Sequence, residues 1–119
     1  PTTLAVLAQA RKRLGTQGKD VQVVYVTVDP ERDDAQRMRA YLRGFDPGFV
    51  GGTGTPAQLA SVRKDYGVMA VRKPVGDSYS VGHSSSVYLI DRNGRLRGMM
   101  PYGRSPADYV HDIRVLLGE

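Results

Sequence analysis

The residue of this chain best suited to chemistry is His83, one of two histidines among 119 residues. It lies in the polar approach to an apolar run, and residues 79–91 read YSVGHSSSVYLID. An imidazole fixed at the rigid end of a strand can act as metal ligand, acid or base with little reorganisation. A single histidine without identified partners is more often a surface or hydrogen-bonded residue, so His83 by itself favours the ordinary interpretation.

Three other features suggest chemistry but have a simpler structural interpretation. The turn with Asp29, Asp33 and Asp34 has too few ligands for a calcium loop, and we expect it to cap the following helix. Residues 51–54 (GGTG) lack the Walker lysine and the dinucleotide glycine spacing, which favours a turn over a phosphate site. His111 falls within the last predicted helix, where we expect it to be exposed and assign it no role.

The composition is that of one soluble globular domain, with 40% hydrophobic and 24% charged residues. No segment is apolar and long enough to span a membrane, and the start of the chain does not suggest an intact signal peptide, so we expect any membrane anchor to lie outside these residues. The chain contains no cysteine, which excludes a disulfide framework, a thiol nucleophile and a thiolate metal site within these residues.

The chain is basic, with a formal net charge of +5. This charge favours an acidic partner or a membrane surface. The tight basic run Arg11–Arg13 is most simply a solvated helix face, with docking to an acidic partner as the second interpretation and nucleic acid as the weakest. We therefore expect no nucleic-acid partner.

The first helix is predicted over residues 1–15, with Leu4, Leu7, Ala8 and Leu14 on one face and Gly15 or Gly18 as its end. Its Pro1 suits a first helical turn, so the capping residue and the segment that leads into the helix are expected to precede Pro1. The remaining elements of the first half alternate between strands and helices. They are a central strand at 21–28 covered on both faces, a helix at 35–45, a short strand from 49–50, and a helix from a capping box at 55–58 to Gly67.

The second half predicts a hairpin followed by a helix. Its elements are a short strand at 68–71, a loop at 72–78, antiparallel strands at 86–91 and 96–100 around an Asn-Gly turn, and a helix capped at 105–108 that docks on a sheet.

This order predicts an α/β domain with a central mixed sheet, parallel and antiparallel in parts, covered by helices on both faces. A buried strand and helix followed by a hairpin and a terminal helix is the thioredoxin-like arrangement, provided that one more strand precedes Pro1. We therefore interpret residues 1–119 as a single thioredoxin-like domain that is incomplete at its N-terminal side.

Five phrases follow one another along the chain: PTTLA at 1–5, VTVDPERD at 26–33, FDPGFVGGTG at 45–54, YGV at 66–68, and HS at 83–84 followed by YLID at 88–91. In this order they resemble the SCO (SenC/PrrC) family of copper chaperones for cytochrome c oxidase assembly. Each phrase is weak alone, but together they cover nearly the whole chain in order.

The resemblance implies a copper site, Cu(I) or Cu(II), made by two cysteines of a Cys-x-x-x-Cys motif before Pro1 and by His83. It implies that Asp29 orients a ligand or a partner and is not itself a ligand. The Cys-x-x-x-Cys segment is absent from this chain, so we expect the chain alone to bind copper poorly. Gly82 replaces an acidic residue that the family often has before its histidine.

The same resemblance implies copper delivery to the dinuclear copper site of cytochrome c oxidase subunit II, with other copper chaperones as further partners. It implies a membrane-anchored parent protein on the periplasmic or extracytoplasmic side, or in the mitochondrial intermembrane space of a eukaryote. Two alternatives stay open: a thiol-disulfide oxidoreductase that acts on the cysteines of oxidase subunit II, and a metal-independent interaction module.

Overall fold

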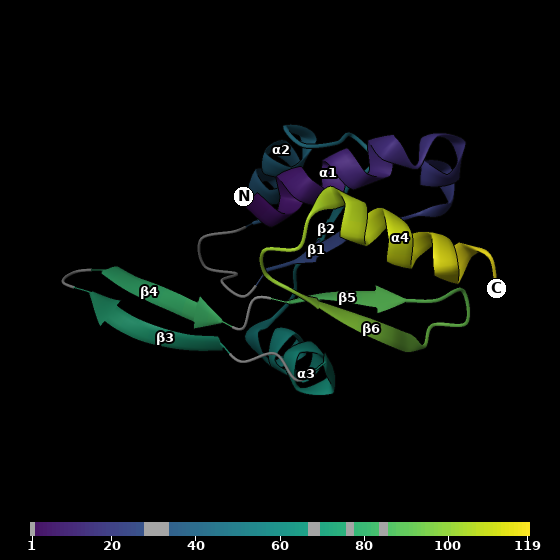
Figure 1. The fold of residues 1–119 in the computed structure, drawn as a ribbon. Coiled ribbons are helices and arrows are strands. Elements are labelled where there is room, and N and C mark those ends of the chain that lie inside the picture. Colours follow the sequence, from purple (N-terminus) through teal and green to yellow (C-terminus); the bar gives the residue numbers. More distant parts are fainter. Residues whose placement is uncertain (1, 28–33, 67–69, 76–77, 84–85) are drawn as a thin grey trace. The chain divides into compact units, whose positions relative to one another are not determined.

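The computed structural model describes residues 2–27, 34–66, 70–75, 78–83 and 86–119. Its elements, drawn in Figure 1, are α1 (Thr2–Arg13), η1 (Gly15–Asp20), β1 (Val24–Val26), α2 (Ala35–Arg43), β2 (Val50–Gly52), α3 (Pro56–Tyr66), β3 (Ala70–Val75), β4 (Ser78–His83), β5 (Ser86–Ile90), β6 (Leu96–Pro101) and α4 (Pro106–Leu117). Contacts divide the chain into two compact units, residues 1–23 with 85–119 and residues 24–84. Within the described residues, no helix is long and apolar enough to cross a membrane.

The first unit is built on the packing of α1 against α4. Leu4, Leu7, Ala10 and Leu14 of the first helical segment are buried, which confirms the predicted face except at Ala8, which is only half-buried. The helix ends where Gly15 adopts a positive φ of 62°, as the sequence predicted. On α4, Tyr109 is 2% exposed.

The start of α4 is fixed by a capping box. The Ser105 hydroxyl accepts a hydrogen bond from the Asp108 backbone N–H at 3.2 Å, and the Asp108 carboxylate accepts one from the Ser105 N–H at 3.1 Å. This reciprocal pair satisfies two backbone donors that a helix start leaves without partners, and it confirms the predicted start of the last helix.

The predicted hairpin of the first unit is confirmed as β5 and β6, which pair antiparallel. The Gly94 N–H donates to the Asp91 carbonyl at 3.0 Å, and Gly94 has φ of 77°. Glycine adopts this left-handed backbone without steric strain, so the turn suits its sequence.

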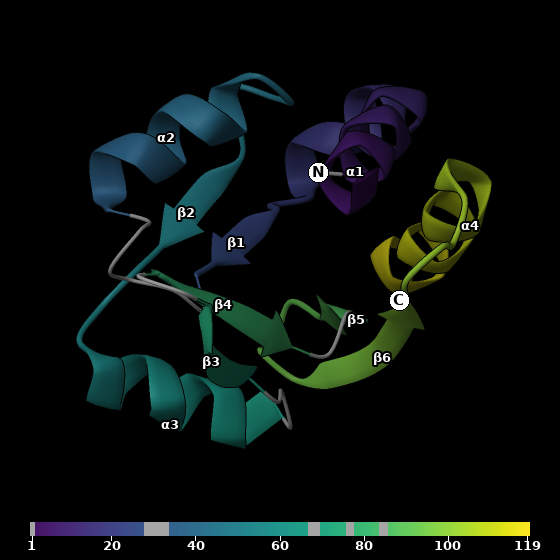
Figure 2. The same ribbon diagram turned by 90° about the vertical axis from the view of Figure 1, so that its left-hand side faces the viewer.

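The second unit contains the parallel pair β1 and β2 and the helix α2, which lies along β2 in Figure 2. The predicted strand 21–28, whose last residue lies outside the described residues, is confirmed over Val24–Val26. Its expected cover on both faces is wrong, because Val24 and Val26 are 57% and 39% exposed. The helix α2 buries Met38 and Leu42.

A loop was predicted for residues 72–78, and this prediction is wrong at residues 72–75 and 78, whereas residues 76–77 lie outside the described residues. Residues 70–75 and 78–83 form the antiparallel hairpin β3–β4, drawn as two long arrows in Figure 1. Pro74 and the polar residues around it suggested a loop, but proline is tolerated in a strand wherever its position needs no backbone donor. Parallel and antiparallel pairing are therefore both present, as predicted, and the described strands pair two by two.

Candidate metal site

His83 is the last residue of β4, and its backbone lies opposite Ala70, the first residue of β3. Six consecutive residue pairs connect the two strands, from Ala70 and His83 to Val75 and Ser78. The sequence predicted that this histidine lies at the end of a strand. The strand expected there was the one that begins at Ser86, with His83 in the polar segment before it. The structure instead gives His83 a strand of its own, paired with a segment that was expected to be partly loop.

Asp29, the second candidate site residue, lies outside the described residues, and its role stays a prediction. The backbone that leads toward it is described as far as Thr27. The Thr27 N–H donates to the Gly52 carbonyl at 3.1 Å, and Thr27 is 1% exposed. The parallel pairing of β1 and β2 therefore fixes the chain up to the residue after β1.

The other acidic and polar motifs have structural roles, as predicted. The Asp34 carboxylate accepts a hydrogen bond from the Arg37 N–H at 2.7 Å and caps α2. The Thr55 hydroxyl accepts from the Gln58 N–H at 3.1 Å, while the Gln58 side chain accepts from the Thr55 N–H at 2.9 Å. These contacts account for Asp34, Thr55 and Gln58 as helix-capping residues, whereas Asp33 of the predicted capping turn lies outside the described residues.

Gly51 lies in β2 for a packing reason that the sequence did not reveal. A Cβ atom at this position would lie 2.6 Å from Met38 Cε and 3.2 Å from Leu42 Cδ1. Glycine therefore allows α2 to approach the strand closely. The glycine-rich segment was expected to be a turn, and Val50–Gly52 is instead a strand that α2 packs on.

His111 is exposed, as predicted, with 79% of its side chain accessible. Its Nδ1 lies 2.8 Å from Asp112 Oδ1. Among the described residues, His111 belongs to no group of three metal-ligating side chains.

Metal-ligating side chains do not gather in the described part of the chain: no three of its His, Asp and Glu residues lie together in a group able to hold an ion. The sequence contains no cysteine. A copper site with thiolate ligands therefore needs donors from outside these 119 residues, and the residues present do not complete such a site by themselves.

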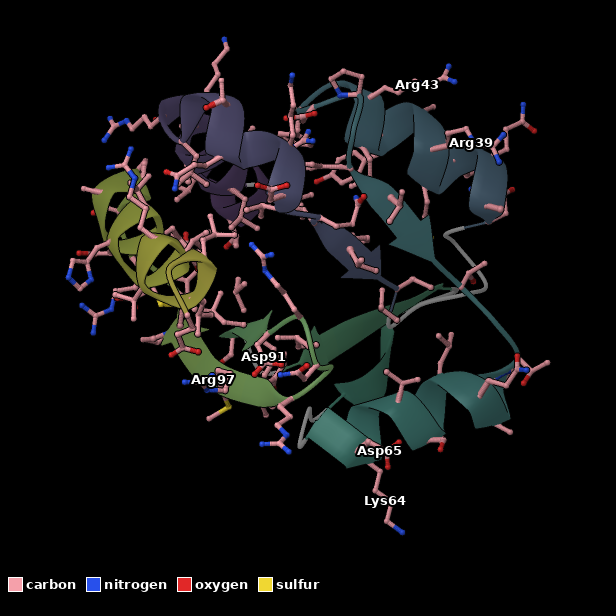
Figure 3. The ribbon with its side chains drawn as sticks, turned by 90° about the vertical axis from the view of Figure 1, so that its right-hand side faces the viewer. Arg39, Arg43, Lys64, Asp65, Asp91 and Arg97 are labelled. Carbon is pink, nitrogen blue, oxygen red and sulfur yellow. The ribbon has the colours of Figure 1, made fainter. Side chains whose placement is uncertain are left out.

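A carboxylate network at the β5–β6 turn was missed by sequence reasoning. One oxygen of Asp91 accepts hydrogen bonds from the N–H groups of Asn93 and Arg95 at 2.9 and 3.0 Å, and the other lies 3.2 Å from the Arg97 guanidinium. Arg97 also binds Glu119 at 2.6 and 2.8 Å. Figure 3 shows Asp91 and Arg97 side by side on this hairpin.

This network shifts the ionisation of its members. The Arg95 N–H above all, together with the Arg97 guanidinium and the Asn93 N–H, holds the pKa of Asp91 below its ordinary value, although burial acts in the opposite direction. The hydrogen bonds from Arg97 likewise lower the pKa of Glu119, and the two carboxylates raise the pKa of Arg97. An Asp just before an Asn-Gly turn is the sequence signal that could have indicated the Asp91 contacts.

The element order and the mixture of parallel and antiparallel strand pairs define an α/β protein, and solved structures show which kind. The chain matches the structure of Bradyrhizobium japonicum ScoI with copper bound over 98% of its length and 74% of that chain, with a TM-score of 0.88 and 33% sequence identity. The fold is therefore thioredoxin-like, as predicted.

Sequence comparisons identify the family. The family model SCO1/SenC matches residues 1–118. An SCO2-like protein of Rickettsia conorii is 32% identical over 96% of this chain and 57% of its own length, and a putative copper-binding protein of Stutzerimonas stutzeri is 37% identical over 82% of this chain and 49% of its own. The chain belongs to the SCO1/SenC family. It spans about half the length of the curated relatives that it matches.

Proposed function

We propose that this chain is the thioredoxin-like part of a copper-binding metallochaperone in which His83 is one of the metal ligands. The observation that carries the proposal is membership of the SCO1/SenC family, together with a copper-bound structure of a protein with the same fold. The position of His83 at the end of a paired strand supports it, since a backbone fixed by six residue pairs limits the movement of a ligand at its end.

The other ligands in this proposal are two cysteines that the family resemblance assigns to a segment before Pro1. Soft thiolates with one imidazole suit Cu(I) and can adjust to Cu(II). In this proposal Asp29 does not bind the metal, and its carboxylate orients a ligand or a partner protein.

The bound copper is cargo, and the proposed receiver is the dinuclear copper site of cytochrome c oxidase subunit II. Other copper chaperones are the proposed donors. The proposed location is the periplasmic or other extracytoplasmic side of a membrane, or the mitochondrial intermembrane space in a eukaryote.

A second function is favoured by the thioredoxin-like fold. The same two cysteines would exchange disulfides with those of oxidase subunit II. This alternative predicts turnover of the oxidised subunit without copper, and it predicts that His83→Ala leaves this turnover intact.

The experiment that tests the first function uses the protein with its preceding Cys-x-x-x-Cys segment. Cu(I) affinity is measured by competition with a chromogenic chelator for the parent protein, for His83→Ala and for His111→Ala. Loss of a ligand is expected to weaken binding about ten-fold or more in His83→Ala, because even residues that only support a ligand contribute that much. His111→Ala is the matched control and is expected to bind like the parent; equal affinity of all three proteins would reject the role of His83.

A further inference from the structure

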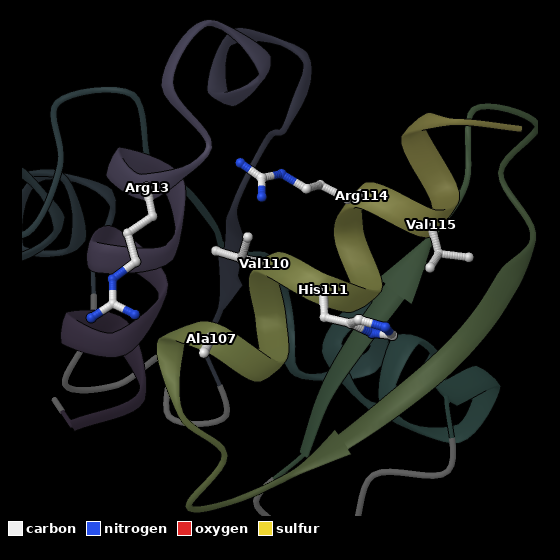
Figure 4. A pocket seen from close by; sticks show the side chains of 6 residues that line it. All are labelled: Arg13, Ala107, Val110, His111, Arg114 and Val115. Carbon is white, nitrogen blue, oxygen red and sulfur yellow. The ribbon is translucent and has the colours of Figure 1, made fainter.

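In the first unit, helix α4 carries a surface that has no part in the proposed copper site. An open groove of about 590 Å³ lies along this helix and the end of α1 (Figure 4). The residues that line it are Arg13, Ala107, Val110, His111, Arg114 and Val115. No acidic residue is among them.

The α4 residues of this groove form one continuous helix face. Ala107, Val110, His111 and Arg114 follow one another at positions i, i+3, i+4 and i+7, and Val115 adds the next position. The helix therefore has two distinct faces. One contains the buried Tyr109, whereas the other combines apolar and basic side chains and ends in Val115, which is 54% exposed.

Cationic groups border the apolar part of the groove. Arg13 belongs to the basic end of α1, where Arg11 and Lys12 precede it. Within the described part of the chain, the Arg13 side chain has no hydrogen-bond or ion-pair partner. Arg114 uses Nε to donate to Gln17 Oε1 at 3.3 Å, a contact that leaves its two terminal nitrogens available for an acceptor.

The combination of an apolar helix face with bordering arginines indicates the chemistry of an occupant. Apolar side chains of a partner helix would lie against Val110 and Val115, and its carboxylates would meet Arg13 and Arg114. Arginine binds carboxylates in a two-pronged geometry and is enriched at protein interfaces. The net charge of +5 adds long-range attraction for an acidic partner.

We propose that this groove is a docking site for an acidic amphipathic helix of a partner protein. A protein partner is favoured over an anionic membrane because the groove follows α4 and the end of α1 and sets Ala107, Val110 and Val115 beside two arginines, an arrangement that fits the side chains of one helix. The site uses residues of α1 and α4 only, and its occupation needs neither His83 nor copper.

The test uses the full chain and a fluorescently labelled helical peptide with glutamates on one face and leucines on the other. Fluorescence anisotropy measures its binding, and we expect the affinity to fall as salt is added. Two control peptides separate charge from shape: one has lysines in place of the glutamates, and the other has the same composition in scrambled order. Both are expected to bind far more weakly, and equal binding of the scrambled peptide would overturn the proposal.

The location is tested with matched charge reversals. Arg13→Glu with Arg114→Glu is expected to weaken peptide binding about ten-fold, because two ion pairs become repulsions. Arg39→Glu with Arg43→Glu makes the same change of net charge on α2, at two exposed arginines that Figure 3 labels, and is expected to leave most of the binding. Equal losses in the two variants would show that net charge alone attracts the peptide, and would reject the groove.

Two further measurements distinguish loss of the docking site from misfolding of the variants and from binding to a membrane. Val115→Asn changes an exposed side chain without altering the charge and is expected to weaken binding several-fold, with an unchanged circular dichroism spectrum. Vesicles with anionic lipids are titrated against the same variants. If the protein binds the vesicles, loses this binding when Arg13 and Arg114 are reversed, and does not bind the peptide, the proposal is contradicted and the face is assigned to a membrane.

Discussion

The guanidinium of Arg97 binds the carboxylate of Glu119 through two hydrogen bonds of 2.6 and 2.8 Å, and so connects β6 to the residue that follows the C-cap of α4. The two-pronged geometry is the strongest that an arginine makes with a carboxylate. Because both side chains are solvent-accessible, we expect the link to position the end of α4 more than to stabilise the whole domain.

Substitution of Arg97 by glutamine is expected to loosen this link. Glutamine keeps a polar side chain but cannot neutralise Asp91 and Glu119. The melting temperature should fall by about a few degrees at most, since exposed ion pairs contribute little. Hydrogen exchange should accelerate in the last turn of α4. Arg92→Gln, in the turn of the same hairpin, is the control. If hydrogen exchange in the last turn of α4 accelerates equally in Arg92→Gln, the specific role of Arg97 is rejected.

The stability of the folded chain should depend on pH through Asp91 and Glu119. Their ordinary pKa values are 3.8 and 4.5, and both pKa values are lowered in the folded protein. As the pH falls, these two carboxylates therefore take up protons in the unfolded chain before they do so in the folded protein. Their contribution to stability is complete above about pH 4.5 and is lost as the pH falls through their lowered pKa values in the folded protein.

Urea unfolding between pH 7 and pH 3 measures this dependence. Asp91→Asn removes the charge but keeps an oxygen that can accept the backbone hydrogen bonds of the turn, so its midpoint should fall less steeply below pH 4.5. An Asp91→Asn variant with the same pH profile as the parent would exclude Asp91 as a source of the acid sensitivity.

Gly51→Ala should destabilise the second unit. The new methyl group would meet the buried Met38 at 2.6 Å, so α2 or the end of the Met38 side chain must shift, with an expected loss of about 1–2 kcal/mol. Gly52→Ala is the matched control, because its methyl group would lie 3.5 Å from Val26 Cγ2, an ordinary contact. Chemical unfolding of the two variants compares them directly, and equal stabilities would refute the packing account of Gly51.

Loss of the capping box should weaken the start of α4. Ser105→Ala removes the acceptor for the Asp108 N–H and is expected to lower the free energy of unfolding by about 1 kcal/mol. Ser105→Asn keeps a good capping side chain and should restore most of this loss. The account fails if alanine and asparagine give the same unfolding midpoint.

Local signals explain most of what the sequence predicted correctly. The two capping boxes, at Thr55 and Ser105, fix helix starts through contacts three residues apart, which a sequence displays directly. The turn at Gly94 is local in the same sense.

Contacts between distant segments explain what the sequence did not predict. Residues 72–78 resemble a loop because they combine Pro74 with glycine and polar residues, yet residues 72–75 pair with the segment that ends at His83. The Arg97–Glu119 link joins residues 22 positions apart, and the approach of Met38 to Gly51 depends on how a helix packs on a strand. For the candidate site, the sequence indicated His83 and its strand end, but its likeness to a family was needed to suggest which metal and which ligands.

The central claim, that His83 binds copper, is tested most directly by X-ray absorption at the copper edge. The protein with its preceding Cys-x-x-x-Cys segment is loaded with Cu(I), and the spectra of the parent and of His83→Ala are compared. We expect two sulfur ligands and one imidazole nitrogen in the parent, and loss of the imidazole signal in the variant. An identical ligand shell in both proteins would contradict the assignment of His83.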